Sequence, residues 1–380
     1  MRRIVGLIVG VSLCQAANAQ QPFNPEAFRA ELQRKMNLIQ PLSQELNWQR
    51  LPWVTSPDEA LQQARDENRP ILLWVAGGRQ RDGTPLERCC AYAANLRTGP
   101  LNDEQVVQRI SATMVPLAIN NDRIPPTPGG RLIRSVLHDT NASQGLWILH
   151  PRGSVLGYHY FRPRAGESNS ASDARWVRET REFVETGLKE FGPVAERSVV
   201  PKPVVPQRGQ GWLPDGSMRL ALYARQMVNG KHDGKPTVAS LDLPPNAWRD
   251  FVPGVATVGH RWDIPVPTAQ RLAPALSPHT DAMTVPRERD VHTANLRATV
   301  EQIRAGKIYV RVQGELASEH DRDGGQNHPI RTRGRVDGLV VVDQARGEPE
   351  SLLLIVAGSY RNPPPYDTPR GSAAALTWHR

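Results

Sequence analysis

The stretch "SPDEALQQARDENRPILLWVAG" (residues 56–77) decides the fold of the first half of the chain. Its first four residues, "SPDE" (56–59), form a capping box with proline at the first helical position, which predicts a helix to about Asn68. Pro70 ends that helix, and "ILLWVA" (71–76) is a continuous apolar run of strand length. Such runs are typical of strands that are buried on both faces of a sheet. The stretch therefore predicts a helix that leads into a central strand of an α/β domain.

The following residues extend this pattern to a complete sheet. Residues 101–120 predict a helix capped by Asn102 and a second strand, and residues 121–143 read as a polar loop rich in proline and glycine. The segments "GLWIL" (145–149) and "SVLGYHYF" (154–161) predict a hairpin, and apolar residues at helical spacing predict a helix from about 170 to 191. We therefore expect one mixed sheet that is covered by helices on both faces.

The second half of the chain has a different character. Residues 193–211 are rich in proline and read as an extended linker. Residues 212–290 are interrupted by prolines, whereas residues 291–378 alternate between apolar and polar side chains, which predicts a β-sandwich or barrel-like domain. The predicted organisation is a signal peptide (1–19), an N-terminal helical segment (20–48), an α/β domain (49–192), the linker (193–211) and a mainly β domain (212–380).

The N-terminal residues "MRRIVGLIVGVSLCQAANA" (1–19) are typical of a secretory signal, with two arginines, a short apolar run and a small-residue cleavage site. Cleavage near Ala19 predicts an extracytoplasmic, periplasmic or secreted protein, and it removes Cys14. The apolar run is shorter than the roughly 20 residues that span a bilayer, and no later stretch reaches that length. We therefore expect no membrane span in the mature protein.

Composition favours a globular protein without a nucleic-acid partner. The 380 residues are 39% hydrophobic and 22% charged, and the formal net charge is +9. The basic residues are mostly arginines scattered among acidic residues, without a dense basic run or interleaved aromatic residues. That pattern argues against a nucleic-acid interface.

Residues of about 50–192 resemble the thioredoxin-like superfamily. The resemblance rests on residues 56–77, on cysteines near the start of the next helix, on residues 101–120 and on "QGLWILHPRGSVLGY" (144–158). It implies a thioredoxin-like α/β domain in which the cysteines follow the central strand and face the start of the hairpin.

Two features depart from the family pattern. Cys89 and Cys90 are adjacent, whereas the family motif has two residues between its cysteines. The family's cis-proline position is taken by Gln144-Gly145-Leu146, which contains no proline. The C-terminal half is similar to regions of large secreted bacterial proteins of unassigned function, and that similarity implies no chemistry.

Cys89 and Cys90 are the candidate catalytic residues, because a thiolate near a helix start or a cation is a nucleophile. Thr84-Pro85-Leu86-Glu87 is itself a capping box, which would place both cysteines in the second helical turn with free thiols. Adjacent residues in a helix point about 100° apart, so a Cys89–Cys90 disulfide requires that the helix begins after Cys90. Both geometries stay open at this point. A copper(I) site is a further alternative, since thiolates select soft metals.

Other polar residues give weaker signals. The segment 314–329 gathers Glu315, Glu319, His320, Asp321, Asp323 and His328, which could hold a divalent ion or form an exposed hairpin loop. We assign His150 to a turn and regard His138-Asp139 as lying beside a loop. Trp74 and Trp147 fall in predicted strands and are assigned to the core.

The sequence thus supports two functional hypotheses. The first is thiol–disulfide exchange, or related thiol chemistry, on a protein partner in the cell envelope, without a cofactor. The second is a non-catalytic binding protein, with a degenerate thioredoxin-like scaffold and a β interaction domain.

Overall fold

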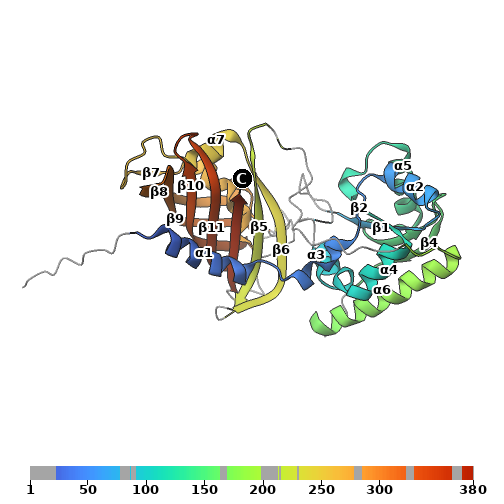
Figure 1. Cartoon of the computed structure of the whole chain (residues 1–380). Helices are drawn as coiled ribbons and strands as arrows, with labels where there is room; N and C mark the ends of the chain where they lie inside the picture. The colour runs from blue at the N-terminus through green and yellow to red at the C-terminus, as the bar shows by residue number, and fades with distance from the viewer. Residues whose placement is uncertain are drawn as a thin grey trace, which may run out of the picture.

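The computed structural model describes residues 23–77, 86, 91–162, 169–197, 213, 215–228, 231–277, 285–321, 329–361 and 370–379. Within these residues the chain forms an α/β region with a mixed four-stranded sheet and a region built on an eight-stranded antiparallel sheet. Figure 1 shows the two regions side by side, with the α/β region formed by the earlier part of the chain.

The sheet of the α/β region has the strand order β2-β1-β3-β4. Strands β1 and β2 are parallel, while β3 is antiparallel to both of its neighbours, β1 and β4. The predicted central strand is confirmed, because all six residues of β1 are buried. The strands are β1 (Ile71–Ala76), β2 (Val115–Asn120), β3 (Gly145–Leu149) and β4 (Val155–His159).

Helices cover both faces of this sheet. The cluster that contains Leu73 and Trp147 packs under α2 and α5, and the cluster that contains Trp74 packs under α3, α4 and α6. The predicted N-cap of α2 is confirmed, since the Ser56 side chain accepts a hydrogen bond from the backbone N–H of Glu59. The helices are α2 (Pro57–Asp66), α3 (Ala91–Thr98), α4 (Glu104–Thr113), α5 (Pro128–Asp139) and α6 (Asn169–Phe191).

Two local predictions in this region are wrong. Residues 121–143 contain the helix α5, whose N-cap is Thr127 and whose apolar face includes Ile133 and Val136. The pair Gly129-Gly130 lowers helix propensity, but it lets α5 approach the backbone of Pro57 and Pro125 closely. The cap of α4 is Asp103 instead of Asn102, because Asn102 ends the short 3-10 helix η2 (Pro100–Asn102).

The second region is one antiparallel sheet with the order β6-β5-β12-β11-β10-β9-β8-β7. The strands predicted after residue 291 are confirmed, but the sheet also recruits β5 and β6 from the proline-interrupted segment. The described strands do not form the two stacked sheets of a sandwich. The strands are β5 (Met218–Val228), β6 (Lys231–Leu243), β7 (Arg261–Asp263), β8 (Val291–Arg304), β9 (Lys307–Asp321), β10 (Pro329–Asp343), β11 (Glu348–Arg361) and β12 (Arg370–His379).

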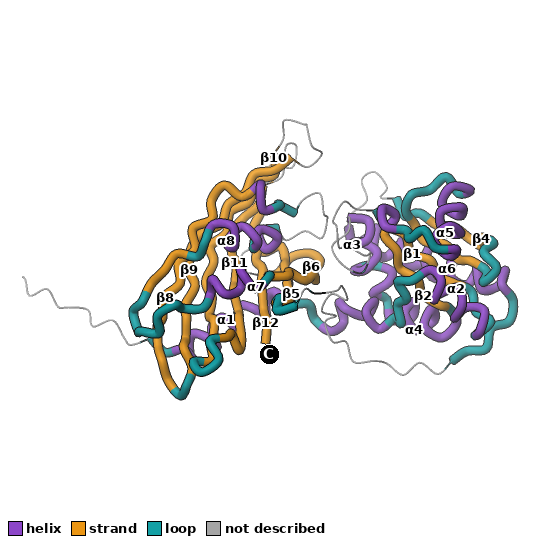
Figure 2. The backbone as a smooth tube through the Cα atoms, turned by 90° about the horizontal axis from the view of Figure 1, so that it is seen from above, coloured by secondary structure: helices purple, strands orange, loops and turns teal. Residues whose placement is uncertain are grey.

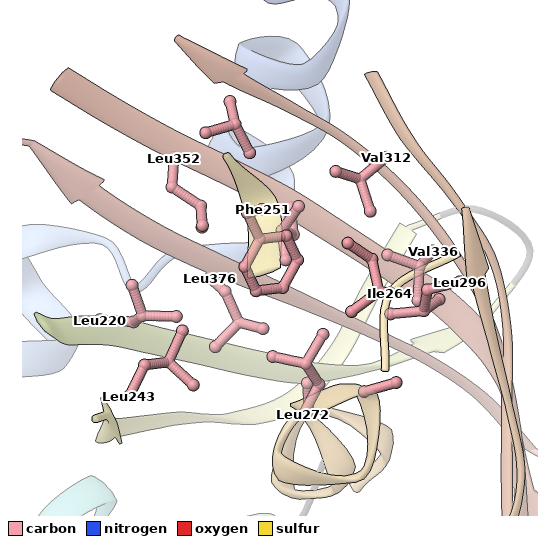
Figure 3. Packing of buried hydrophobic residues seen from close by; sticks show 14 of the residues in the cluster. Leu220, Leu243, Phe251, Ile264, Leu272, Leu296, Val312, Val336, Leu352 and Leu376 are labelled. Carbon is pink, nitrogen blue, oxygen red and sulfur yellow. The ribbon is translucent and has the colours of Figure 1, made fainter. Parts of the chain in front are cut away.

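Short helices fill the inner face of this sheet. They are α7 (Pro245–Trp248), α8 (Val266–Arg271) and the 3-10 helix η5 (Ala273–Leu276). Figure 3 shows Phe251 and Leu272 packed against strand residues such as Leu376 and Val336, all of them in one buried apolar cluster. This burial explains the single-sheet architecture, because the helices take the place that a second sheet would occupy.

The N-terminal helix α1 (Pro25–Ile39) lies across the outer face of the eight-stranded sheet (Figure 1). Its N-cap is Asn24, whose side chain accepts a hydrogen bond from the Ala27 N–H. Phe28 and Leu32 pack on Leu353 and Ile355 of the sheet. The 3-10 helix η1 (Ser43–Arg50) follows and packs with the α/β region. The predicted helical segment 20–48 is therefore shared between the two regions.

Part of the predicted linker is bound to the α/β region. The Arg197 N–H donates to the carbonyl of Ala112 at 3.2 Å, and its Nε donates to the carbonyl of Ser111 at 2.6 Å. Arg69 donates to the carbonyl of Ala195 at 2.6 Å. The segment up to Arg197 thus lies against the C-terminal end of α4. Residues 198–212 lie outside the described residues.

None of the described helices combines the length and the apolar character that crossing a bilayer requires.

Candidate functional site

Cys89 and Cys90, the predicted catalytic residues, lie outside the described residues, as does the predicted signal peptide. Their neighbours in sequence are described: β1 ends at Ala76 and α3 is described from Ala91. In the sequence, the cysteines therefore lie between the described end of β1 and the described start of α3. We take the described residues around this connection as the candidate site.

The first turn of α3 packs against the end of the β3–β4 hairpin. The ring of Tyr92 stacks on the ring of Tyr160, with centroids 4.9 Å apart and an interplanar angle of 22°. Tyr92 also lies 6.5 Å from Trp176 of α6, and its side chain belongs to the buried cluster of Trp74 and Leu96. The residue two positions after Cys90 is thus fixed against residues that are 68 or more positions later in the chain.

The segment before β3 contacts the same aromatic residues at the end of the hairpin. Gln144 donates a hydrogen bond from Nε2 to the Tyr160 hydroxyl at 3.1 Å, and the Tyr158 hydroxyl donates to the Gln144 carbonyl at 3.3 Å. Gly145 has a φ of +152°, and a Cβ there would lie 2.6 Å from the Tyr158 ring. Glycine is therefore required at this position, and the hydroxyl groups of Tyr158 and Tyr160 hydrogen-bond to Gln144 beside it.

A half-buried polar group lies beside this aromatic cluster. His159 Nε2 is 3.5 Å from Glu179 Oε2, and Arg175 binds both carboxylate oxygens of Glu179 at 3.0 and 3.1 Å. The His159 ring packs edge-on against Phe161, with centroids 4.2 Å apart. Sequence reasoning missed this group, because its members come from β4 and α6 and share no local motif.

The pKa of His159 lies below its ordinary value, chiefly because burial disfavours the imidazolium; Arg175 adds to this effect and Glu179 opposes it. At neutral pH the imidazole is therefore uncharged. The charge of the group resides in the Arg175–Glu179 pair.

This environment predicts a pH dependence of stability. His159 protonates in the unfolded chain near pH 6.5 but resists protonation when folded. The contribution of neutral His159 to the free energy of unfolding should therefore be fully present above about pH 6.5. It should be lost as the pH drops towards the lower pKa that His159 has in the folded protein. Urea unfolding of the wild type and of His159→Gln between pH 7.5 and 5 tests this. We expect a shallower decline for His159→Gln, and equal declines would contradict the assignment.

The other predicted residues take structural positions. His150 lies in the β3–β4 turn, where its Nδ1 accepts from the Arg152 N–H at 3.1 Å, as predicted. Trp74 and Trp147 are fully buried in the core, also as predicted. His138 and Asp139 lie exposed at the end of α5.

The acidic segment after Gly314 forms ion pairs in its described part. Glu315 binds Arg333 at 2.7 Å, and Glu319 binds Arg331 at 3.0 Å. Asp323 and His328 lie outside the described residues. Among the residues that the structure describes, no group of three or more His, Cys, Asp or Glu side chains could hold a metal ion.

A cavity of about 360 Å³ lies apart from this site, between α4 and the end of α6. Its lining carries two basic side chains, Arg109 and Lys189, and two acidic ones, Glu185 and Glu196, so that the formal charges cancel. Arg109 binds Glu185 at 2.7 and 3.0 Å and also pairs with Glu196.

No family model matches the chain, and no curated protein matches it either.

Proposed function

We propose that the α/β region is a thioredoxin-like domain of an exported protein, and that it carries out thiol–disulfide exchange through Cys89 or Cys90. The observation that carries the proposal is the strand order β2-β1-β3-β4, with β3 antiparallel to its neighbours. In the thioredoxin-like superfamily the reactive cysteines follow the strand that corresponds to β1, and they face the start of the strand that corresponds to β3. The contacts of Tyr92 with Tyr160, and of Tyr160 with Gln144, support the same convergence here.

The proposed reaction is a two-electron exchange. The thiolate of Cys89 or Cys90 attacks one sulfur of a substrate disulfide, and a mixed disulfide forms while the substrate S–S bond breaks. The released substrate sulfur leaves as a thiolate and takes a proton from water. A second thiol, from the neighbouring cysteine or from a small-molecule reductant, then attacks the mixed disulfide and releases the substrate in its reduced form.

Insulin reduction by the mature protein (residues 20–380), with dithiothreitol as the electron source, tests this proposal. We expect the wild type to accelerate precipitation of the insulin B chain over the reductant alone. Cys89→Ser and Cys90→Ser should differ: loss of the attacking thiol removes the acceleration, whereas loss of the second thiol lowers it. The double variant is the matched blank. A wild type that reacts no faster than this blank would refute the proposal.

A non-catalytic binding role is the second candidate, and the segment before β3 favours it. Gln144 and Gly145 replace the proline whose neighbouring backbone aligns substrates in the family, and two tyrosines hold the replacement segment. A binding function needs the fold but not the thiols. For a binding protein, we therefore expect the wild type and the variant with both cysteines replaced by serine to retain a partner from an envelope extract equally well.

A further inference from the structure

The chain changes from one region to the other within three residues. Helix α1 packs on the outer face of the eight-stranded sheet through Phe28, Leu32 and Ile39. The next element, η1, is bound to the α/β region, because the backbone N–H of Asn47 donates to Asn102 Oδ1 at 2.9 Å and Asn47 Nδ2 donates to the Asn102 carbonyl at 3.1 Å. The segment Gln40–Leu42 between them is a short extended connection.

Arg225 of β5 binds both ends of this connection. Its Nε donates to the carbonyl of Ile39 at 2.8 Å, and one terminal nitrogen donates to the carbonyl of Gln40 at 3.1 Å. The guanidinium also forms a two-point pair with the carboxylate of Glu45, one bond of which is 3.1 Å long. The Arg225 side chain is only 1% exposed. A cation from the sheet thus caps the C-terminal carbonyls of α1 and holds the first turn of η1.

Glu45 is fixed from a second side. Its carboxylate accepts the backbone N–H of Leu42 at 2.6 Å, which closes the start of η1. Because Glu45 belongs to the element that is bound to Asn102, the Arg225–Glu45 pair is a direct link between the two regions. A buried guanidinium that lost this carboxylate would keep its charge without a counter-ion, so the link is costly to open.

A second approach between the regions lies near the candidate site. Helix α3, which directly follows the cysteines in sequence, lies beside the edge strand β6, and the two views agree on this placement (Figure 1 and Figure 2). Strand β6 pairs with β5, the strand that carries Arg225. The contact with α3 and the Arg225 link therefore lie on neighbouring strands of the sheet.

We propose that Arg225 and Glu45 form a latch that closes the α/β region over the edge strand β6, with Gln40–Leu42 as the hinge. In the latched state β6 covers one side of α3. When the pair opens, α1 stays on the sheet, η1 stays with the α/β region, and rotation about the hinge uncovers α3. The latch stands on the contacts of described residues, and its consequence for thiol access rests on the proposed function.

Hydrogen exchange of the mature protein, read on peptides that cover α3, tests the latch together with the radius of gyration from X-ray scattering. We expect Arg225→Met and Glu45→Gln to raise the exchange rate of the α3 amides at least tenfold and to increase the radius of gyration. The control is Arg219→Met on the same strand, since Arg219 pairs with Asp242 inside the sheet at 2.6 and 2.7 Å. It should match the wild type in both measurements.

The latch is overturned if Glu45→Gln, which keeps Arg225 on the carbonyls of Ile39 and Gln40, leaves both measurements at the wild-type values. This variant also decides the case if Arg225→Met does not fold. Neither readout depends on a reactive thiol, so a failure of the latch and a failure of thiol exchange are distinguished. If both hold, the latch variants should also reduce a folded disulfide protein faster than the wild type does.

Discussion

Substitution of Gly314 by alanine is expected to destabilise the eight-stranded sheet by about 3 kcal/mol or more. Gly314 lies in β9 opposite Leu296 of β8 and Val336 of β10, in the interior of the strand order. Its φ is +155°, and a Cβ would lie 1.8 Å from the carbonyl oxygen of Asn295. Because the obstacle is backbone, a side-chain rotation cannot relieve it, and β8 must move away from β9.

Chemical denaturation of this sheet, followed by circular dichroism, measures the effect. Gly254→Ala is the matched control, since no atom lies within 4 Å of a Cβ at that position. We expect it to change the free energy of unfolding by less than about 0.5 kcal/mol. A Gly314→Ala protein as stable as Gly254→Ala would show that β8 and β9 do not approach each other as described.

Substitution of Trp147 by alanine is expected to cost the α/β region about 3–5 kcal/mol, because it empties a large volume in a closely packed core. Trp147 is fully buried in β3, and its ring centroid lies 4.8 Å from that of Tyr158. Its indole N–H donates to the Thr140 hydroxyl at 3.2 Å, which ties β3 to the end of α5. The urea midpoint of the α/β region measures the loss.

Thr140→Val separates the packing of Trp147 from its hydrogen bond. This variant removes the acceptor but keeps the ring in place, so its expected cost is about 1–2 kcal/mol. Similar costs for Thr140→Val and Trp147→Ala would mean that the hydrogen bond, not the buried ring, accounts for the stability at this position.

The strands that could be predicted are those whose sequence pattern reflects burial directly. The run "ILLWVA" (71–76) is continuous because β1 is covered on both faces, and the alternation of β10 follows from one face on the helical core. Other strands could not be predicted, because their burial depends on contacts with residues far away in the sequence. Strand β5 contains Arg219 and Arg225, whose charges argue against a buried strand until their partners, Asp242 and Glu45, are known.

The position of α1 could not be predicted from the sequence. Its apolar face, with Phe28 and Leu32, is visible as helical spacing, but the surface that receives it comes from residues near 340, 354 and 374. No local signal states which surface a helix covers. The helix α5 was not predicted for a different reason. The pair Gly129-Gly130 is typical of loops, but here it permits close packing of a helix.

The candidate site was predicted in part. The order of the sequence elements predicts strand β1 and the β3–β4 hairpin, and both are present, whereas the catalytic role of Cys89 and Cys90 stays a prediction. The His159–Glu179–Arg175 group does not, because histidine and carboxylate come together only when α6 packs over β4. A histidine within an alternating strand carries no signal of its pairing.

The most direct test of the account is the reaction of Cys89 and Cys90 with a maleimide reagent in the folded mature protein, after reduction and counted by mass spectrometry. We expect at least one thiol to react without denaturant, at a rate that falls as the pH drops, because the thiolate is the reactive form. Two thiols that react only after unfolding would contradict it and leave the binding role.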